Sequence, residues 1–129
     1  MDPARLKKIP LFAELSKKEH EQIGRWADEV EVQQGKHLID EGRFGYEFFV
    51  IEEGAAEVKH GDETIASLGP GDFFGEIALM EADRRTASVI ASQPLKAIVM
   101  TRRDFSEMQT EMPSVAAQIR QAVEDRRGS

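Results

Sequence analysis

The sequence has no cysteine, which excludes disulfide bonds, thiolate metal ligands and thiol chemistry. It has no run of about 18 apolar residues, the length that a membrane-spanning helix requires. Its first ten residues lack the apolar stretch of a secretory signal. We therefore expect a cytoplasmic protein that makes no membrane contact.

Positive charge is also scarce, since 17 Lys and Arg face 24 Asp and Glu and the net charge is −7. Nucleic-acid binders usually carry a basic face, so this balance argues against that class. An anionic ligand would need positive potential concentrated at one place. The length of 129 residues and 40% hydrophobic content instead fit one globular domain with a substantial core.

Metal and catalytic chemistry find little support in the sequence. The three histidines, His20, His37 and His60, lack metal-ligand spacing on one element. We predict that all three lie on the surface. No Ser-His-Asp or Cys-His order is present, so we expect no enzyme, no metal and no cofactor, and we disfavour a cupin-type metalloenzyme.

The pattern along the chain predicts helices at both ends and short strands between them. Residues 2–28 favour helix, with a break at Pro10 and a capping box at Ser16-x-x-Glu19. From residue 29 to residue 100, short alternating runs separated by glycines indicate a small antiparallel sandwich or barrel. Residues 101–127 predict two helices, the second of which starts at Pro113.

The segment from Gly71 to Val89, GDFFGEIALMEADRRTASV, carries the clearest sign of a site. A turn that follows Gly75 would present free backbone N–H groups, which favour an anion. Arg85 on a following strand would clamp a phosphate from the other side. Glu76 would repel phosphate, but it is suited to accept a hydrogen bond from a ribose hydroxyl. The segment therefore predicts a pocket for a cyclic phosphodiester.

Phe74–Leu79 and Arg85–Ala87 resemble the phosphate-binding cassette of the cyclic nucleotide-binding domain family. The resemblance spans roughly residues 11–127. It implies that backbone amides of Ile77 and Ala78 hold the phosphate and that Arg85 pairs with a non-bridging oxygen. It further implies that Glu76 binds the ribose 2′-OH and that Thr86 contacts the phosphate or the purine edge. Val58, Leu68 and Val89 would form an apolar wall for the base. The candidate ligand-binding residues are therefore Gly75, Glu76, Ile77, Ala78, Arg85, Thr86, Val58, Leu68 and Val89.

Two departures from the family pattern leave questions open. Arg84 stands where the family often has proline, so two adjacent arginines compete for the phosphate, and the alignment favours Arg85. Residues 43–46 replace a turn that is often acidic. For Val58, Leu68 and Val89, an ordinary position in the hydrophobic core without ligand contact is an equal alternative. Val115, Ile119 and Val123 form a helical stripe that suits a lid over the base, a dimer seam or docking on the domain itself.

These observations predict an α+β, mainly β fold: an eight-stranded antiparallel, jelly-roll-like β-roll with a short cassette helix. Residues 1–129 would form a single cyclic nucleotide-binding domain, with N-terminal helices at 1–28, the β-roll at 29–100 with its cassette at 73–87, and C-terminal helices at 101–127. The resemblance implies a sensor of cAMP rather than cGMP that changes conformation and signals to an effector protein or fused domain. A protein-interaction domain with a vestigial pocket is the alternative.

The C-terminal helix bears on the partners that we expect. Only 17 residues run from Pro113 to Ser129, enough for one helix, so specific DNA binding is not expected. A homodimer through this helix is a further possibility.

Overall fold

The computed structural model describes residues 3–42, 44–45, 47–75, 83–84 and 87–127. The first 26 residues contain two 3-10 helices, η1 (Pro3–Lys8) and η2 (Pro10–Phe12), and then helix α1 (Lys17–Trp26). The predicted break at Pro10 is confirmed, because proline suits the first position of η2. The predicted capping box is also confirmed: Ser16 Oγ accepts from the Glu19 amide at 3.1 Å and Glu19 Oε1 accepts from the Ser16 amide at 2.9 Å.

The prediction that His20 lies on the surface is wrong. Its side chain is only 1% exposed, and its Nε2 lies 2.6 Å from the carbonyl oxygen of Phe12. His20 shares the buried face of α1 with Ile23, three residues further on, and Ala27, directly after the helix, is also buried. Burial there is tolerated because the ring nitrogen binds a carbonyl at the end of η2. His37 and His60 are exposed, as predicted.

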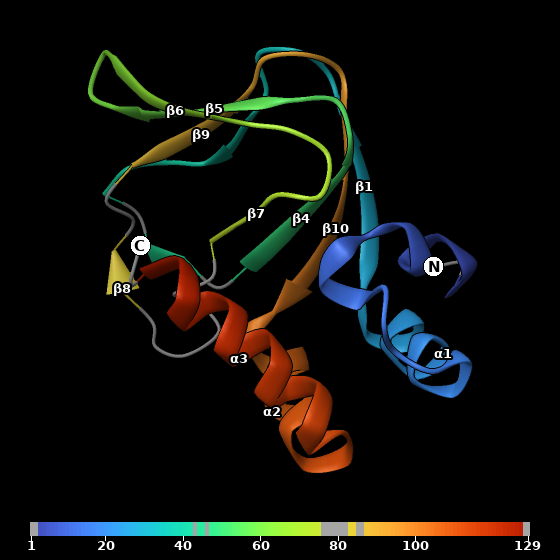
Figure 1. Cartoon of the computed structure of the whole chain (residues 1–129). Helices are drawn as coiled ribbons and strands as arrows, with labels where there is room; N and C mark the ends of the chain where they lie inside the picture. The colour runs from blue at the N-terminus through green and yellow to red at the C-terminus, as the bar shows by residue number, and fades with distance from the viewer. Residues whose placement is uncertain (1–2, 43, 46, 76–82, 85–86, 128–129) are drawn as a thin grey trace.

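Two four-stranded antiparallel sheets make up the β-roll, as predicted (Figure 1). The first sheet has the order β1 (Asp28–Val32), β10 (Leu95–Thr101), β4 (Glu47–Glu53) and β7 (Phe73–Phe74). The second has the order β2 (His37–Ile39), β9 (Ser88–Ala91), β5 (Ala56–His60) and β6 (Glu63–Leu68). A separate short pair joins β3 (Phe44–Gly45) to β8 (Asp83–Arg84).

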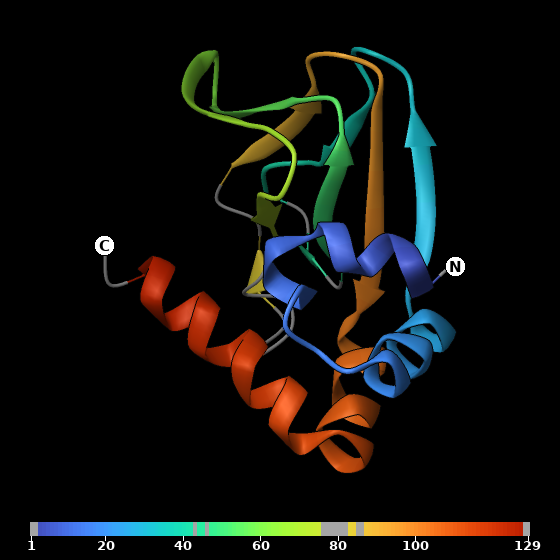
Figure 2. The same ribbon diagram turned by 45° about the vertical axis from the view of Figure 1, so that its right-hand side comes forward.

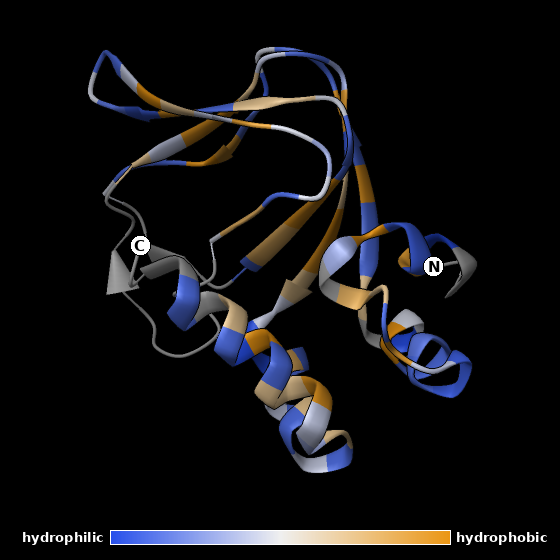
Figure 3. Cartoon of the chain, viewed as in Figure 1, coloured by the Kyte–Doolittle hydropathy of each residue, from blue (hydrophilic) through white to orange (hydrophobic). Residues whose placement is uncertain are grey.

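The first sheet carries apolar side chains on both faces, because it separates two hydrophobic clusters. On β10, Ile98 and Met100 face the cluster shared with the helices, whereas Ala97 and Val99 face the cluster between the two sheets. This alternation follows from the two-residue period of a strand. Hydrophobic colour accordingly dominates β4 and β10, while the outer loops and hairpins are largely hydrophilic (Figure 3).

Helices α2 (Arg102–Glu111) and α3 (Pro113–Arg127) complete the fold and extend below the β-roll, beside the N-terminal helices (Figure 2). The capping box of Thr101 and Asp104 starts α2. Val115 and Ile119 are 1% exposed and pack into the cluster shared with the helices, called the first cluster below. This part of the predicted helical stripe therefore docks on its own domain.

Candidate functional site

The strand that leads into the predicted cassette is fixed by two aromatic contacts. Phe74 stacks on Phe49 between the sheets, with ring centroids 4.9 Å apart. Phe73 points the opposite way and packs against Phe48 at 5.7 Å, beside the helix-side cluster. Gly75 follows with φ +78°, a conformation that side chains rarely adopt. The structure therefore places a left-handed backbone conformation at the glycine from which the predicted anion site begins.

The turn before this strand is closed by backbone hydrogen bonds. Asp72 Oδ2 accepts from the Gly69 amide at 2.8 Å, and the Gly69 carbonyl accepts from the Asp72 amide at 3.0 Å. Gly71 and Asp72 also exchange hydrogen bonds with Ile51 on β4, at 2.8 and 2.9 Å. With these groups paired, the position of Gly75 is set by the first sheet rather than by a free loop.

The three residues predicted to form the apolar wall lie together. Val58 and Val89 are directly opposite each other on β5 and β9, and Leu68 on β6 is opposite Ala56. Residues paired in this way share one face of the sheet. All three, with Phe74, belong to or pack against the cluster between the sheets. Leu68 and Val89 are 8% and 4% exposed, so they are core residues here, and their contact with a base stays a prediction.

Sequence analysis missed the contacts that hold the other side of this region. Ser88 Oγ accepts a hydrogen bond from the Glu41 amide at 2.9 Å, and Glu41 Oε1 accepts one from the Gly61 amide at 3.0 Å. Ser88 lies three residues after Arg85. Ser88 lies 47 positions from Glu41 in the chain, so no local pattern indicates this contact. These bonds join the segment after β2 and the β5–β6 hairpin to the start of β9.

Two segments depart from the family pattern, residues 43–46 and the position of Arg84, and their described parts lie side by side. Phe44 pairs with Arg84 and Gly45 with Asp83 in the β3–β8 ladder. The backbone just before Arg85 is thus set against the upstream turn. The remaining candidates fall outside the described residues, so their convergence on one ligand stays a prediction: Glu76, Ile77, Ala78, Arg85 and Thr86.

The described ranges contain no group of three or more His, Cys, Asp or Glu side chains positioned to hold a metal ion. Within the same part of the chain, no helix combines the length and apolar character needed to cross a membrane.

Gly75 thus directly follows Phe74, which belongs to the hydrophobic cluster between the two sheets of the roll. The family profile described as "Cyclic nucleotide-binding domain" matches residues 29–111. The chain belongs to the cyclic nucleotide-binding domain family.

Known relatives agree with this assignment. A cAMP-dependent protein kinase regulatory subunit of Mycosarcoma maydis is 36% identical over 109 residues, which cover 78% of this chain and 21% of that protein. The catabolite activator protein of Thermus thermophilus is 27% identical with a TM-score of 0.79, covering 92% of this chain and 57% of that one. A putative cyclic nucleotide-binding protein from Geobacter metallireducens shares the fold at 22% identity, with a TM-score of 0.84 and coverage of 97% and 94%. The chain thus spans about a fifth of the kinase subunit that it matches.

Proposed function

We propose that this domain binds a cyclic nucleotide, cAMP in preference to cGMP, as a non-catalytic sensor that signals to an effector protein or fused domain. The single observation that carries the proposal is the turn at Gly75 beside the inter-sheet cluster of Val58, Leu68 and Val89. A ligand there would place its anionic group at the amides after Gly75 and its base toward the apolar cluster. The kinship with a cAMP-dependent regulatory subunit supports cAMP as the first ligand to test.

We assign the charged contacts as the family resemblance implies. Arg85 would pair bidentately with the phosphate, and Glu76 would accept a hydrogen bond from the ribose 2′-OH. Ile77 and Ala78 would donate backbone hydrogen bonds to the same phosphate, and Thr86 would add a hydroxyl contact. Local positive potential from these groups would offset the net charge of −7.

Signalling would pass through the cluster that the site shares with the helices. Phe73, two residues before Gly75, packs against a cluster that contains Phe105 and Met108 of α2 and Ile119 of α3. A ligand that binds one arrangement of this cluster better than another would shift the helices by its difference in affinity. We expect cAMP to change amide hydrogen exchange in residues 102–127 by this route.

Calorimetric titration with cAMP and cGMP tests the binding proposal. Arg85→Ala should weaken cAMP binding by about 30- to 4,000-fold, because truncating one member of a buried charge pair typically costs about 2–5 kcal/mol. Arg85→Lys should also weaken binding, since an ammonium lacks the planar fork of a guanidinium. Arg84→Ala is the matched control, and its affinity should stay within about threefold of wild type, because Arg85 rather than Arg84 would make the phosphate contact.

Two outcomes would contradict the proposal in different ways. A larger loss in Arg84→Ala than in Arg85→Ala would move the phosphate contact to the neighbouring arginine. Absence of heat with either nucleotide, together with no rise in melting temperature at millimolar ligand, would indicate a vestigial pocket, because a bound ligand stabilises the folded state by mass action.

A further inference from the structure

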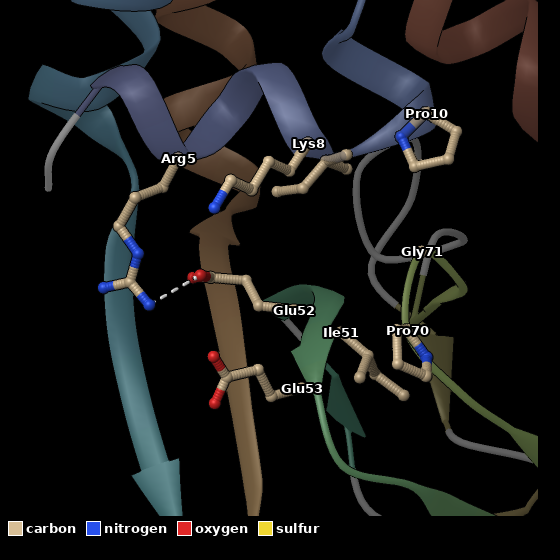
Figure 4. Close-up of a pocket in the computed structure, with 9 residues that line it drawn as sticks. Arg5, Lys8, Pro10, Ile51, Glu52, Glu53, Pro70 and Gly71 are labelled. Carbon is tan, nitrogen blue, oxygen red and sulfur yellow. Dashed lines mark ion pairs between the residues drawn. The ribbon is translucent and has the colours of Figure 1, made fainter.

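A second cluster of charges lies away from the candidate site, where η1 crosses the outer face of the first sheet (Figure 4). Arg5 of η1 reaches Glu29 on β1, with Nη1 2.7 Å from Oε1 and 2.6 Å from Oε2. Its other terminal nitrogen, Nη2, lies 2.9 Å from Glu52 Oε2 on β4. These two strands are separated by β10 in the sheet. One guanidinium therefore ties the N-terminal segment to both sides of β10.

The two carboxyl groups are neighbours, because both bind the terminal nitrogens of one guanidinium. Within the described ranges, Glu29 Oε2 and Glu52 Oε1 are buried and have no hydrogen-bond partner, although Arg5 Nη1 lies 2.6 Å from Glu29 Oε2. Two ionised carboxylates have no proton to donate, so a hydrogen bond between them would require that one of them be protonated. A single proton held between the two groups would satisfy both oxygens.

Burial makes that proton stable in the folded protein. The side chain of Glu52 is 8% exposed. Its burial, together with the hydrogen bond and negative charge of Glu29, raises the pKa of Glu52 to about 7. Burial also acts to raise the pKa of Glu29, but the hydrogen bond from Glu52 and the charges of Arg5 and Lys96 outweigh it and leave that pKa below its ordinary value. The raised pKa makes Glu52 the member that would carry a shared proton.

The surrounding charges come from four elements. Lys96 on β10 lies 3.6 Å from Glu29 Oε1 and 3.4 Å from Glu31 Oε1. Lys8 and Glu53 line the cavity of about 240 Å³ beside Glu52, and the nearby β6–β7 turn adds only Pro70 and Gly71 there. Arg5 and Lys96 are already shared among several carboxylates, so ionisation of Glu52 adds a buried negative charge without adding a cation.

We propose that Arg5, Glu29 and Glu52 form a proton-sensitive latch that holds the N-terminal 3-10 helices on the β-roll. With the proton in place, Glu52 donates to Glu29 while Arg5 binds both carboxyl groups. When the proton leaves, two buried like charges compete for one guanidinium, and release of η1 exposes them to water. The latched form is favoured at low pH and opening is favoured as the pH rises.

Hydrogen exchange of the whole chain, measured from pH 5.5 to pH 8 and corrected for the intrinsic pH dependence of exchange, tests the latch. Protection of residues 3–12 should fall by about 20-fold over this range if opening returns Glu52 to an ordinary pKa. Glu52→Gln should remove this pH dependence, because the amide of glutamine can donate to Glu29 at every pH and still accept from Arg5. Glu53→Gln, at the exposed neighbouring position, should keep the wild-type profile.

A carbon-13 titration of the glutamate carboxyl groups gives an independent readout. One carboxyl should titrate near pH 7 in wild type and in Glu53→Gln, and this transition should be absent in Glu52→Gln. The proposal is overturned if no carboxyl titrates above about pH 5.5, or if protection of residues 3–12 does not depend on pH. No nucleotide enters either measurement, so the result is independent of the proposed ligand.

Discussion

Replacing Gly54 by alanine should destabilise this domain much more than the same replacement at Gly35. Both glycines have a left-handed backbone, with φ of +88° at Gly54 and +90° at Gly35. A Cβ added at Gly35 would meet no atom within 4 Å, whereas one added at Gly54 would lie 2.1 Å from the carbonyl oxygen of Pro94. The pair separates backbone strain from steric overlap.

The magnitudes follow from these two contributions. A left-handed non-glycine residue costs about 1–2 kcal/mol, of which roughly 0.4–1 kcal/mol is offset by the lower entropy of the unfolded chain. Gly35→Ala should therefore cost about 1 kcal/mol. At Gly54 the obstacle is backbone on the neighbouring turn, so the turns must separate, and overpacking adds about 1–3 kcal/mol.

Equilibrium unfolding in urea measures the difference. With a denaturant dependence of about 2 kcal/mol per molar, Gly54→Ala should unfold at a urea concentration about 0.5–1.5 M lower than Gly35→Ala. Equal midpoints for the two variants would refute the reasoning, because they would show that the contact between the Gly54 and Pro94 turns costs nothing to open.

Because burial raises the pKa of Glu52 from 4.5 to about 7, its contribution to stability is complete below pH 4.5 and is lost as the pH rises through 7. At pH 8, Glu52→Gln should therefore have a higher free energy of unfolding in urea than wild type, by at most about 3 kcal/mol. Equal stability of the two proteins at pH 8 would contradict this prediction. His20→Ala should lower the free energy of unfolding by about 2–4 kcal/mol through the cavity and the lost bond to Phe12, whereas the exposed His37→Ala should change it by less than about 0.5 kcal/mol. Gly75→Ala should weaken cAMP binding by about tenfold, because the positive φ costs an alanine about 1–2 kcal/mol where the proposed phosphate site begins. If calorimetry shows an unchanged affinity for cAMP, Gly75 is not part of the binding site.

Local signals in the sequence were sufficient where a structure depends on neighbours in the chain. The capping box at Ser16 appears as predicted, because it needs only a hydroxyl and a carboxylate three residues apart, and Thr101 with Asp104 repeats the same arrangement at the start of α2. The stripe of Val115 and Ile119 indicated an apolar helix face, but a lid over the base, a dimer seam and docking on the domain itself were equally compatible with it. Its docking on the first cluster depends on Phe12 and Phe48, which lie far away in the chain.

Short ladders and buried polar groups were beyond such signals. Strands β3, β7 and β8 have two residues each, too few for any periodicity, and exist because partner strands supply their hydrogen bonds. His20 was assigned to the surface because histidine usually lies there, and only the carbonyl of Phe12 makes its burial tolerable. The contact of Ser88 with Glu41 crosses the roll in the same way.

The family, the order of helices and strands, and the candidate residues of the cassette could all be predicted without the structure, because glycine turns, capping boxes and alternating strands are local in the chain. The meeting of Arg5, Glu29 and Glu52 on one face of the first sheet could not, because it arises only from packing between distant segments. No periodicity links those three positions. Their shared proton depends on burial and on distances between side chains, which are set only when the N-terminal helices pack against the assembled strands.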